Sequence, residues 1–283
     1  MLSRRAILKQ LTLAPLAGGV LSTIPFTSVL AAPSKNVPRD IFRELGVRTF
    51  INAAGTFTAM SGSLMRSPVV EVIMDSSHDF CMLDELQDKV GERIAKMVHS
   101  ESAVVTAGAF SALTLGLAGI LTGTDPDKVP LLPQIEGTGL RSEVITQKAH
   151  MIGYSHAFAN TGCKMVYVET AEELEKAVSE KTALMHFLHI QSDKGKIQHE
   201  EWIAIAKKHN IPASIDIAAD VPPVSNLWKF NDMGFDFVAL SGGKAMRGPQ
   251  SAGLLMGKKE IIAGARMHMP PRGENIGRGM KVN

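Results

Sequence analysis

The residues best suited to covalent chemistry lie in Ser241–Gln250, a glycine-rich stretch that contains Lys244. Apolar segments at 235–240 and 251–256 flank this stretch, and each is predicted to form a short buried strand. Gly242 and Gly243 open space around the lysine, which could then approach a flat ligand. Amines that form Schiff bases need such a setting, because burial lowers their pKa. The alternative is a turn lysine in a glycine-rich connection between strands.

A second element supplies an acid. The apolar segment 211–217 is predicted to be a strand that delivers Asp216 at its carboxyl end, 28 residues before Lys244. A carboxylate in such a strand is costly unless a cation pairs with it, and a protonated pyridine nitrogen would be such a cation. Pyridoxal phosphate enzymes need both a lysine for the aldehyde and an acid for the ring. Asp220 is the rival acid, but it follows the strand beside two prolines, where a loop role is expected.

A third element could bind phosphate. Residues 102–106 are predicted to be a strand, and Gly108 and Ala109 then lie at a strand-to-helix turn. Free backbone N–H groups at that helix start would cradle a phosphate, and the hydroxyl of Ser111 could add a further donor. Small residues at such turns also serve packing, so the turn alone is a weak signal. The order of phosphate turn, strand acid and lysine makes the combination specific.

From about Asp40 to the last residue, the chain resembles the fold-type I pyridoxal phosphate enzymes of the selenocysteine synthase (SelA-like) group, with an aminotransferase class-V fold. D-glucosaminate-6-phosphate ammonia-lyase-type proteins are part of that group. The most specific motif is Gly-Gly-Lys-x-x-x-Gly-Pro-Gln at 242–250. The segments that carry the resemblance are Phe50–Thr56, Ala107–Ala109, Gln147–His150, Ile215–Ala218 and Ser241–Gln250.

The resemblance implies a role for each matching residue. Lys244 would form the internal aldimine with pyridoxal 5'-phosphate, and Asp216 would pair with the pyridine nitrogen. The residues near the phosphate would be Gly108, Ala109 and Ser241. His150 would stack on the ring face, the alternative being a histidine at a helix start or in a loop.

The elements between these motifs alternate. Strands are predicted at 164–168, 182–190 and 211–217, and helices at 171–179 and 200–209, after an earlier helix at 84–98. This rhythm predicts an α/β fold, a three-layer sandwich with a mostly parallel central sheet, whose ligands bind at the carboxyl ends of the strands. Residues 124–139, rich in proline and glycine, are predicted to form a loop and are a candidate cover for the site.

The N-terminus carries a targeting pattern. Ser3-Arg4-Arg5 opens a twin-arginine signature, and the mildly apolar run 11–30 follows it. Prolines and glycines within the run make it a poor permanent membrane helix. Small residues before Ala32 offer a cleavage point, so the segment is predicted to be a twin-arginine (Tat) export signal that sends the protein to the periplasm. A cytosolic protein with a basic N-terminus and an uncleaved anchor are the alternatives.

These patterns divide the chain into four parts. Residues 1–31 are the predicted signal, 32–60 an N-terminal arm, and 61–265 the cofactor-binding large domain. Residues 266–283 are interpreted as the start of a small C-terminal domain that is missing or cut short, because the family resemblance implies a sizeable domain there. We therefore expect a legible cofactor fold, in a chain that is either a fragment or a truncated reading frame and whose activity is in doubt.

Composition argues for a globular enzyme and against a nucleic-acid partner. The chain is 45% hydrophobic and 20% charged, with a net charge of +2. Without residues 1–31, which hold three basic residues and no acid, the net charge is near −1, a poor basis for binding a polyanion. Cys81 and Cys163 are expected to be two unpaired buried thiols, with a single bridge as the alternative. His186 and His189 would face opposite sides of a strand, so no metal site is expected there, although His189 could border the active site.

Two classes of function follow. The first is an enzyme, a lyase or transferase, that acts on an amino acid or amino sugar acid. Lys244 would remove the α-proton, and elimination or β-replacement would follow, with racemisation and transamination starting from the same carbanion. The second is a non-catalytic binding or scaffold protein on the same fold. The expected partners are a small amino-acid-type substrate, the Tat export machinery and further copies of the chain in a homodimer or larger homo-oligomer.

Overall fold

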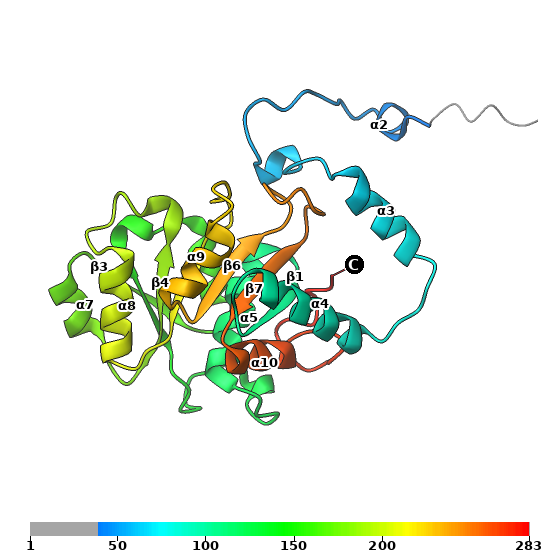
Figure 1. The fold of residues 1–283 in the computed structure, drawn as a ribbon. Helices are drawn as coiled ribbons and strands as arrows, with labels where there is room; N and C mark the ends of the chain where they lie inside the picture. The colour runs from blue at the N-terminus through cyan, green and yellow to red at the C-terminus, as the bar shows by residue number, and fades with distance from the viewer. Residues whose placement is uncertain (1–38, 283) are drawn as a thin grey trace, which may run out of the picture. The chain divides into compact units, whose positions relative to one another are not determined.

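The computed structural model describes residues 39–282 and contains a seven-stranded sheet of order β1-β7-β6-β5-β4-β2-β3. Six strands run in one direction, and β7 is antiparallel to both its neighbours, β1 and β6. The mostly parallel α/β sheet predicted from the sequence is confirmed (Figure 1). The strands are β1 (Ser102–Thr106), β2 (Glu143–Gln147), β3 (Lys164–Val168), β4 (Thr182–Leu188), β5 (Ala213–Asp216), β6 (Phe237–Ser241) and β7 (Gly253–Gly257).

Helices connect most of these strands. The chain divides into residues 1–51, whose described part contains the short helix α2 (Ile41–Glu44), and residues 52–283, which contain the sheet. The other helices are α3 (Ser67–Ser76), α4 (Leu83–Met97), α5 (Gly108–Thr122), α6 (His156–Ala159), α7 (Ala171–Ala177), α8 (His199–Lys208), α9 (Asn226–Met233) and α10 (Lys259–Met267). The predicted domain boundaries at 60/61 and 265/266 stay predictions.

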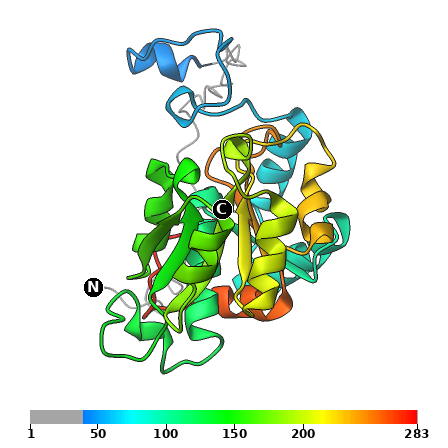
Figure 2. The same ribbon diagram turned by 90° about the vertical axis from the view of Figure 1, so that its left-hand side faces the viewer.

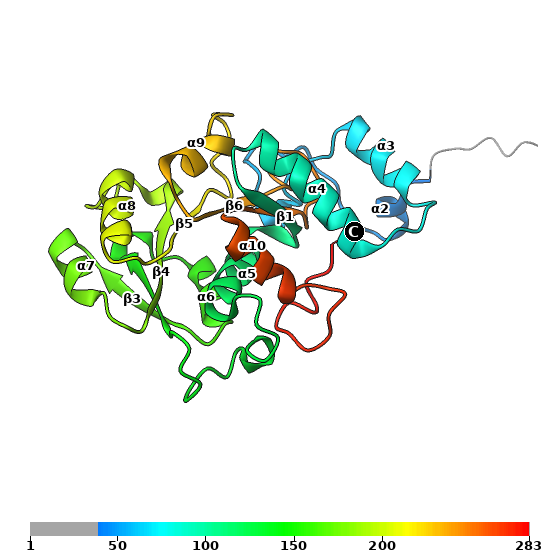
Figure 3. The same ribbon diagram turned by 60° about the horizontal axis from the view of Figure 1, so that its bottom comes forward.

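Helices cover both faces of the sheet (Figure 2), and an apolar core lies between each helical layer and the sheet. Strand β6 shows why, because alternate residues of a strand point to opposite faces. Val238 and Leu240 join the core beneath α4, α7, α8 and α9, whereas Phe237 and Ala239 join the core beneath α5, α6 and α10. Helices α5 and α10 pack side by side on the second face (Figure 3). Burial on both faces explains why central strands such as β6 and β7 are nearly continuous apolar runs.

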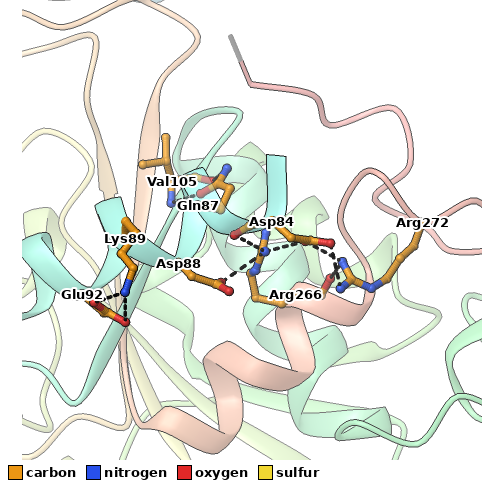
Figure 4. Close-up of polar contacts among 8 residues, drawn as sticks. All are labelled: Asp84, Gln87, Asp88, Lys89, Glu92, Val105, Arg266 and Arg272. Atoms are coloured by element: carbon orange, nitrogen blue, oxygen red, sulfur yellow. Dashed lines mark hydrogen bonds and ion pairs between the residues drawn. The ribbon is translucent and has the colours of Figure 1, made fainter. Parts of the chain in front are cut away.

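Helix α4 closes the edge of the sheet at β1. The buried side chain of Gln87 donates to the carbonyl of Val105 and accepts from its N–H, both at 3.3 Å, and so satisfies backbone groups that an edge strand leaves unpaired. Arg266 on α10 contacts Asp84 at 2.6 Å and Asp88 at 3.3 Å, and Arg272 contacts Asp84 at 3.2 Å (Figure 4). Polar contacts therefore link α4 both to strand β1 and to helix α10.

The element boundaries differ in detail from the predictions. The 182–190 strand ends at Leu188 and the 211–217 strand at Asp216, while residues 124–139 are a loop with one helical turn at Val129–Leu131. This loop leads into the amino end of β2, at the edge of the sheet opposite the ends of β5 and β6, so the expectation that it covers the site is wrong. Cys163 is buried and free as expected, but Cys81 is exposed, so the expectation of two buried thiols is wrong for that residue. Cys81 lies just before α4, in a stretch whose residues are exposed. Within residues 39–282, no helix has the length and apolar character of a membrane span.

Candidate active site at the carboxyl edge of the sheet

The predicted site residues come from different strands but lie along one edge of the sheet. Because β1, β2, β4, β5 and β6 run in the same direction, their carboxyl ends share an edge. Asp216 is the last residue of β5, and Ser241 is the last residue of the neighbouring β6. The antiparallel β7 begins at this same edge with Gly253. The loop that carries Lys244 therefore leaves and re-enters the sheet beside Asp216.

Strand register joins the phosphate turn to the lysine loop. Gly253 pairs with Ser241 on one side and with Thr106 on the other. A Cβ on Gly253 would lie 2.3 Å from the carbonyl carbon of Gly108, so only glycine fits there. Ser241 and the start of α5 are consequently neighbours across a single strand, as a shared phosphate site requires.

The start of α5 has the features of an anion site. Gly108 has φ +85°, a conformation that favours glycine, and the N-cap residue Ala107 offers no side-chain acceptor to the first N–H groups of this 15-residue helix. Those donors, with the positive end of the helix dipole, are free to bind an anion. Ser111 lies one turn later and donates its hydroxyl to the carbonyl of Ala107 at 2.8 Å. Its predicted contact with phosphate stays a prediction.

Asp216 is a buried acid without an ionic partner. Its side chain is 5% exposed, and Oδ1 accepts the N–H of Ala218 at 2.8 Å. Burial raises the pKa of Asp216 to about 6, against the opposing effects of that N–H and of the positive charge of Lys244. No ion pair found among the described residues includes this carboxyl group. The strand thus holds an acid in a place where a bound cation would be strongly stabilised.

Lys244 lies half-buried in a loop that folds back on itself. Gly242 donates to the carbonyl of Ala252 at 2.8 Å, and its own carbonyl accepts from Gly248 at 2.9 Å. A Cβ on Gly243 would lie 2.4 Å from Cα of Gln250, so the two arms of the loop touch and glycine is required. The charge of Lys244 acts on the pKa values of both Asp216 and Asp220. The predicted lysine and acid are therefore brought to one place.

His150 is near the same edge but enclosed. It ends a helical turn directly after β2, is 1% exposed, and accepts the N–H of Leu188 at Nδ1 (3.2 Å). Its ring meets Phe187 edge-on at 4.5 Å between centroids, and burial lowers its pKa to about 4. His150 is thus a neutral ring with a fixed orientation. Its stacking on a cofactor stays a prediction.

Further polar residues lie at this edge: Asp220 is the rival acid and His189 the predicted border of the site, whereas Gln147 and His199 were not assigned a role from the sequence. Burial and the charge of Asp216 raise the pKa of Asp220 to about 6, so the rival acid lies close enough to affect the site. The Gln147 amide bonds both backbone groups of Ile197 at 2.9 Å and thereby fixes the loop that follows β4. His189 contacts His199 at 3.1 Å. Gln147 ends β2, a strand that was not predicted, so its available signal was the segment Gln147–His150 that carries the family resemblance.

No group of three or more candidate metal ligands occurs among residues 39–282. The site is instead built from one amine, buried carboxyl groups and backbone donors. These groups can bind an anion at the start of α5 and a cation at Asp216.

Comparison with known proteins places this site in a family context. Residues 141–276 match the family model described as aminotransferase class-V. D-glucosaminate-6-phosphate ammonia lyase of Salmonella typhimurium is 27% identical over 86% of this chain and 66% of its own length. L-seryl-tRNA(Sec) selenium transferase of Alkaliphilus oremlandii is 26% identical over 78% of this chain and 51% of its own length. The predicted resemblance is confirmed.

Solved structures agree with the sequence matches. A structure of D-glucosaminate-6-phosphate ammonia-lyase superposes with a TM-score of 0.78 at 26% identity and covers 87% of this chain. The fold is thus that of the fold-type I pyridoxal phosphate enzymes. The chain spans less than two thirds of the length of the curated relatives named above.

Proposed function

We propose that this chain, which carries an aminotransferase class-V domain over residues 141–276, is a pyridoxal phosphate-dependent lyase or transferase whose cofactor is held by Lys244. The substrate class we propose is an amino acid or amino sugar acid, and the reaction an elimination or a β-replacement. The names of the relatives support this choice, because one is an ammonia lyase and another a selenium transferase.

The observation that carries the proposal is the unpaired, buried Asp216 next to the loop of Lys244. A carboxyl group with a raised pKa in an apolar strand gains most from a cation delivered by a ligand. The protonated pyridine nitrogen of the cofactor is such a cation. The uncapped start of α5 offers backbone donors for its phosphate, so the residues present fit both ends of the group.

Each residue of the proposed site has its own role in binding the cofactor or in moving a proton. When bound, pyridoxal phosphate supplies an electron sink for the bond broken at the substrate Cα. Asp216 would pair with the protonated pyridine nitrogen, while the N–H groups of Gly108 and Ala109 and the Ser241 hydroxyl would bind the phosphate. The Nζ of Lys244 holds the cofactor before the substrate arrives and then accepts the α-proton.

Reductive trapping tests this function. The purified chain is incubated with pyridoxal phosphate, reduced with borohydride and digested, and the modified peptide is identified by mass. We expect a visible absorption band and a single reduced adduct on Lys244. Pyridoxamine phosphate, which lacks the aldehyde, is the matched control and should leave no adduct. Absence of the adduct, or an adduct spread over surface lysines, would contradict the proposal.

We also propose that the protein acts as a homodimer or larger homo-oligomer. Helix α3 has no buried residue, and Val72 and Met74 on it are more than half exposed, as are Leu64 and Phe80 on either side. Exposed apolar side chains in this density are typical of an interface. Light scattering should give a multiple of the chain mass, and Val72→Glu should reduce it; a monomer at micromolar concentration would contradict the proposal.

Export by the twin-arginine route is a further proposal and rests on the sequence alone. Residues 1–31, with Arg4 and Arg5, lie outside the residues that the structure describes. Replacing both arginines with lysine should trap the precursor in the cytoplasm and leave the thermal stability of the folded part unchanged. Mature-length protein in the periplasm despite the double substitution would refute the route. A periplasmic protein that still begins at Met1 would show an uncleaved anchor instead.

A further inference from the structure

A short segment before α3 lies against the lysine loop. We call residues 57–64 the strap. The N–H of Ser63 donates to the carbonyl of Gly243 at 3.0 Å, the Arg247 side chain donates to the carbonyl of Leu64 at 2.9 Å, and the Gln250 amide donates to the carbonyl of Thr58 at 2.8 Å. The strap therefore contacts both arms of the loop that carries Lys244.

Ser63 makes the most direct of these contacts. Its hydroxyl lies 2.5 Å from the carbonyl oxygen of Lys244 and 3.2 Å from that of Gly243, and its single proton is shared between the two. The Lys244 carbonyl also accepts the N–H of Arg247 at 3.0 Å, which closes the turn after the lysine. A Cβ on the neighbouring Gly62 would lie 2.4 Å from the Gly243 oxygen. The strap thus fixes the backbone of the lysine itself.

The strap has little else to hold it. In the part of the chain that the structure describes, every hydrogen bond found between residues 57–64 and a residue beyond the strap goes to the loop 243–250. The apolar side chains of Phe57 and Leu64 are 62% and 83% exposed, so they contribute little packing. The strap is therefore ordered through its contacts with the lysine loop, which has further hydrogen bonds of its own between Gly242, Gly248 and Ala252.

We propose that Ser63 is a positioning residue for Lys244, and that the strap and the lysine loop become ordered together. The inference rests on the proposed function of Lys244 as the cofactor lysine. Ser63 acts through the loop backbone and not on the reacting atoms. Capture of an aldehyde by Lys244 restricts its loop, and the strap should then lose mobility with it.

Hydrogen–deuterium exchange without cofactor tests the role of Ser63 first. In Ser63→Ala, the loop amides of Arg247 and Gly248 should exchange about fivefold faster, the effect of one lost hydrogen bond. Ser63→Thr keeps a hydroxyl and should retain most of the protection. Ser76→Ala is the matched control, because the Ser76 hydroxyl bonds only within exposed α3. Equal exchange in wild type and Ser63→Ala, or equal acceleration in Ser63→Ala and Ser63→Thr, would overturn the role.

A second arm adds pyridoxal phosphate and follows the strap. In the wild type, formation of the adduct on Lys244 should slow exchange at residues 57–64 several-fold, and in Ser63→Ala the slowing should be much smaller. An adduct on Lys244 that leaves exchange of the strap unchanged would overturn the coupling. If no adduct forms, the proposed function fails, while the cofactor-free arm still decides the role of Ser63.

Discussion

The carboxyl edge of β5 and β6 and the segment from Thr58 to Met97 are held in place by different forces. Asp216 and Ser241 end strands whose neighbours are buried apolar residues on both faces. By contrast, α3 buries no residue, and α4 combines packing on β1 and the core with the polar contacts of Gln87 and the ion pairs of Asp84. The first region depends on close packing over many residues, whereas the second includes a helix without buried residues, α3, and polar contacts of α4 that can be removed singly.

Because of this difference, we expect substitutions in the first region to affect the chemistry of the site and substitutions in the second to affect the stability of the fold. Substitutions at the strand ends should mainly change what the site does, because packing over many other residues holds the sheet together. Substitutions in the second region should change stability and leave the chemistry of Lys244 intact. Four substitutions test whether the chemistry of the site and the stability of the fold can be changed independently.

Lys244→Ala should have the largest effect, a complete loss of the visible band and of the borohydride-reducible adduct. The free energy of unfolding should change by less than about 1 kcal/mol, because the side chain is half-buried and makes no ion pair among the described residues. Lys194→Ala, at an exposed position, is the control and should keep both signals. A band that persists in Lys244→Ala would move the Schiff base to another lysine.

Asp216→Asn should lower turnover by two to four orders of magnitude while some cofactor still binds, since the amide cannot keep the ring nitrogen protonated. The acid has a raised pKa of about 6, so its charged form costs stability as pH rises from about 4 to 6. Without cofactor, the variant should therefore be more stable than wild type at pH 7, by up to about 3 kcal/mol, and the gain should vanish near pH 4. Denaturation of the apoprotein at both pH values measures this.

The same measurement can turn against the assignment. Near-normal turnover of Asp216→Asn would transfer the role to Asp220, whose pKa is also raised to about 6. A variant that is less stable than wild type at pH 7 would show that the carboxylate is favourable in the fold. Either result would contradict the expectation that Asp216 serves the chemistry of the site and not the stability of the fold.

Gly253→Ala should weaken cofactor binding by about 100-fold, because a shift of about 1 Å at the start of α5 disturbs the phosphate donors. The added Cβ would press on the backbone of Gly108, which cannot move aside as a flexible side chain would. Gly273→Ala is the control, with no atom within 4 Å of the new Cβ. Titration of each variant with pyridoxal phosphate gives the comparison, and equal affinities would contradict it.

Asp84→Ala should have the smallest effect on chemistry and destabilise the fold by about 1–3 kcal/mol, because it leaves the largely buried Arg266 short of a partner. Asp88→Ala removes a more exposed contact to the same arginine and should cost less than about 1 kcal/mol. Thermal unfolding measures both. If folded Asp84→Ala protein no longer forms the Lys244 adduct, the contacts of α4 affect the chemistry of the site as well as the stability of the fold.

The sequence was a good guide to the strand ends. Short apolar runs predicted β1, β5, β6 and β7, and the position of Asp216 at the end of its run was enough to place it beside Lys244. In a parallel sheet the carboxyl ends of the strands lie at one edge. An apolar run that identifies a strand therefore also places the last residue of that strand at this edge. Polar residues made other elements harder to detect. Strand β2 (Glu143–Gln147) and helix α9 (Asn226–Met233) mix polar and apolar residues and were not predicted.

The directions of single side chains could not be predicted. The hydroxyl of Ser111 donates back to Ala107, and the ring of His150 is enclosed by Phe187 and the Leu188 N–H. Each depends on atoms far away in the sequence or on a local competition for one proton. For the same reason the contact of Ser63 with Lys244, 181 residues apart, gives no signal in composition or periodicity.

The antiparallel strand β7 also fixes the order in which the sheet can be completed during synthesis. Strand β1 pairs only with β7 among the described strands, and the two are separated by about 150 residues of chain. At about 5–20 residues per second, the ribosome needs roughly 8–30 s to make that stretch. For this time the apolar strand Ser102–Thr106 has no partner, and the phosphate turn cannot meet Ser241. The phosphate turn can therefore come to lie beside Ser241 only after β7 has been made.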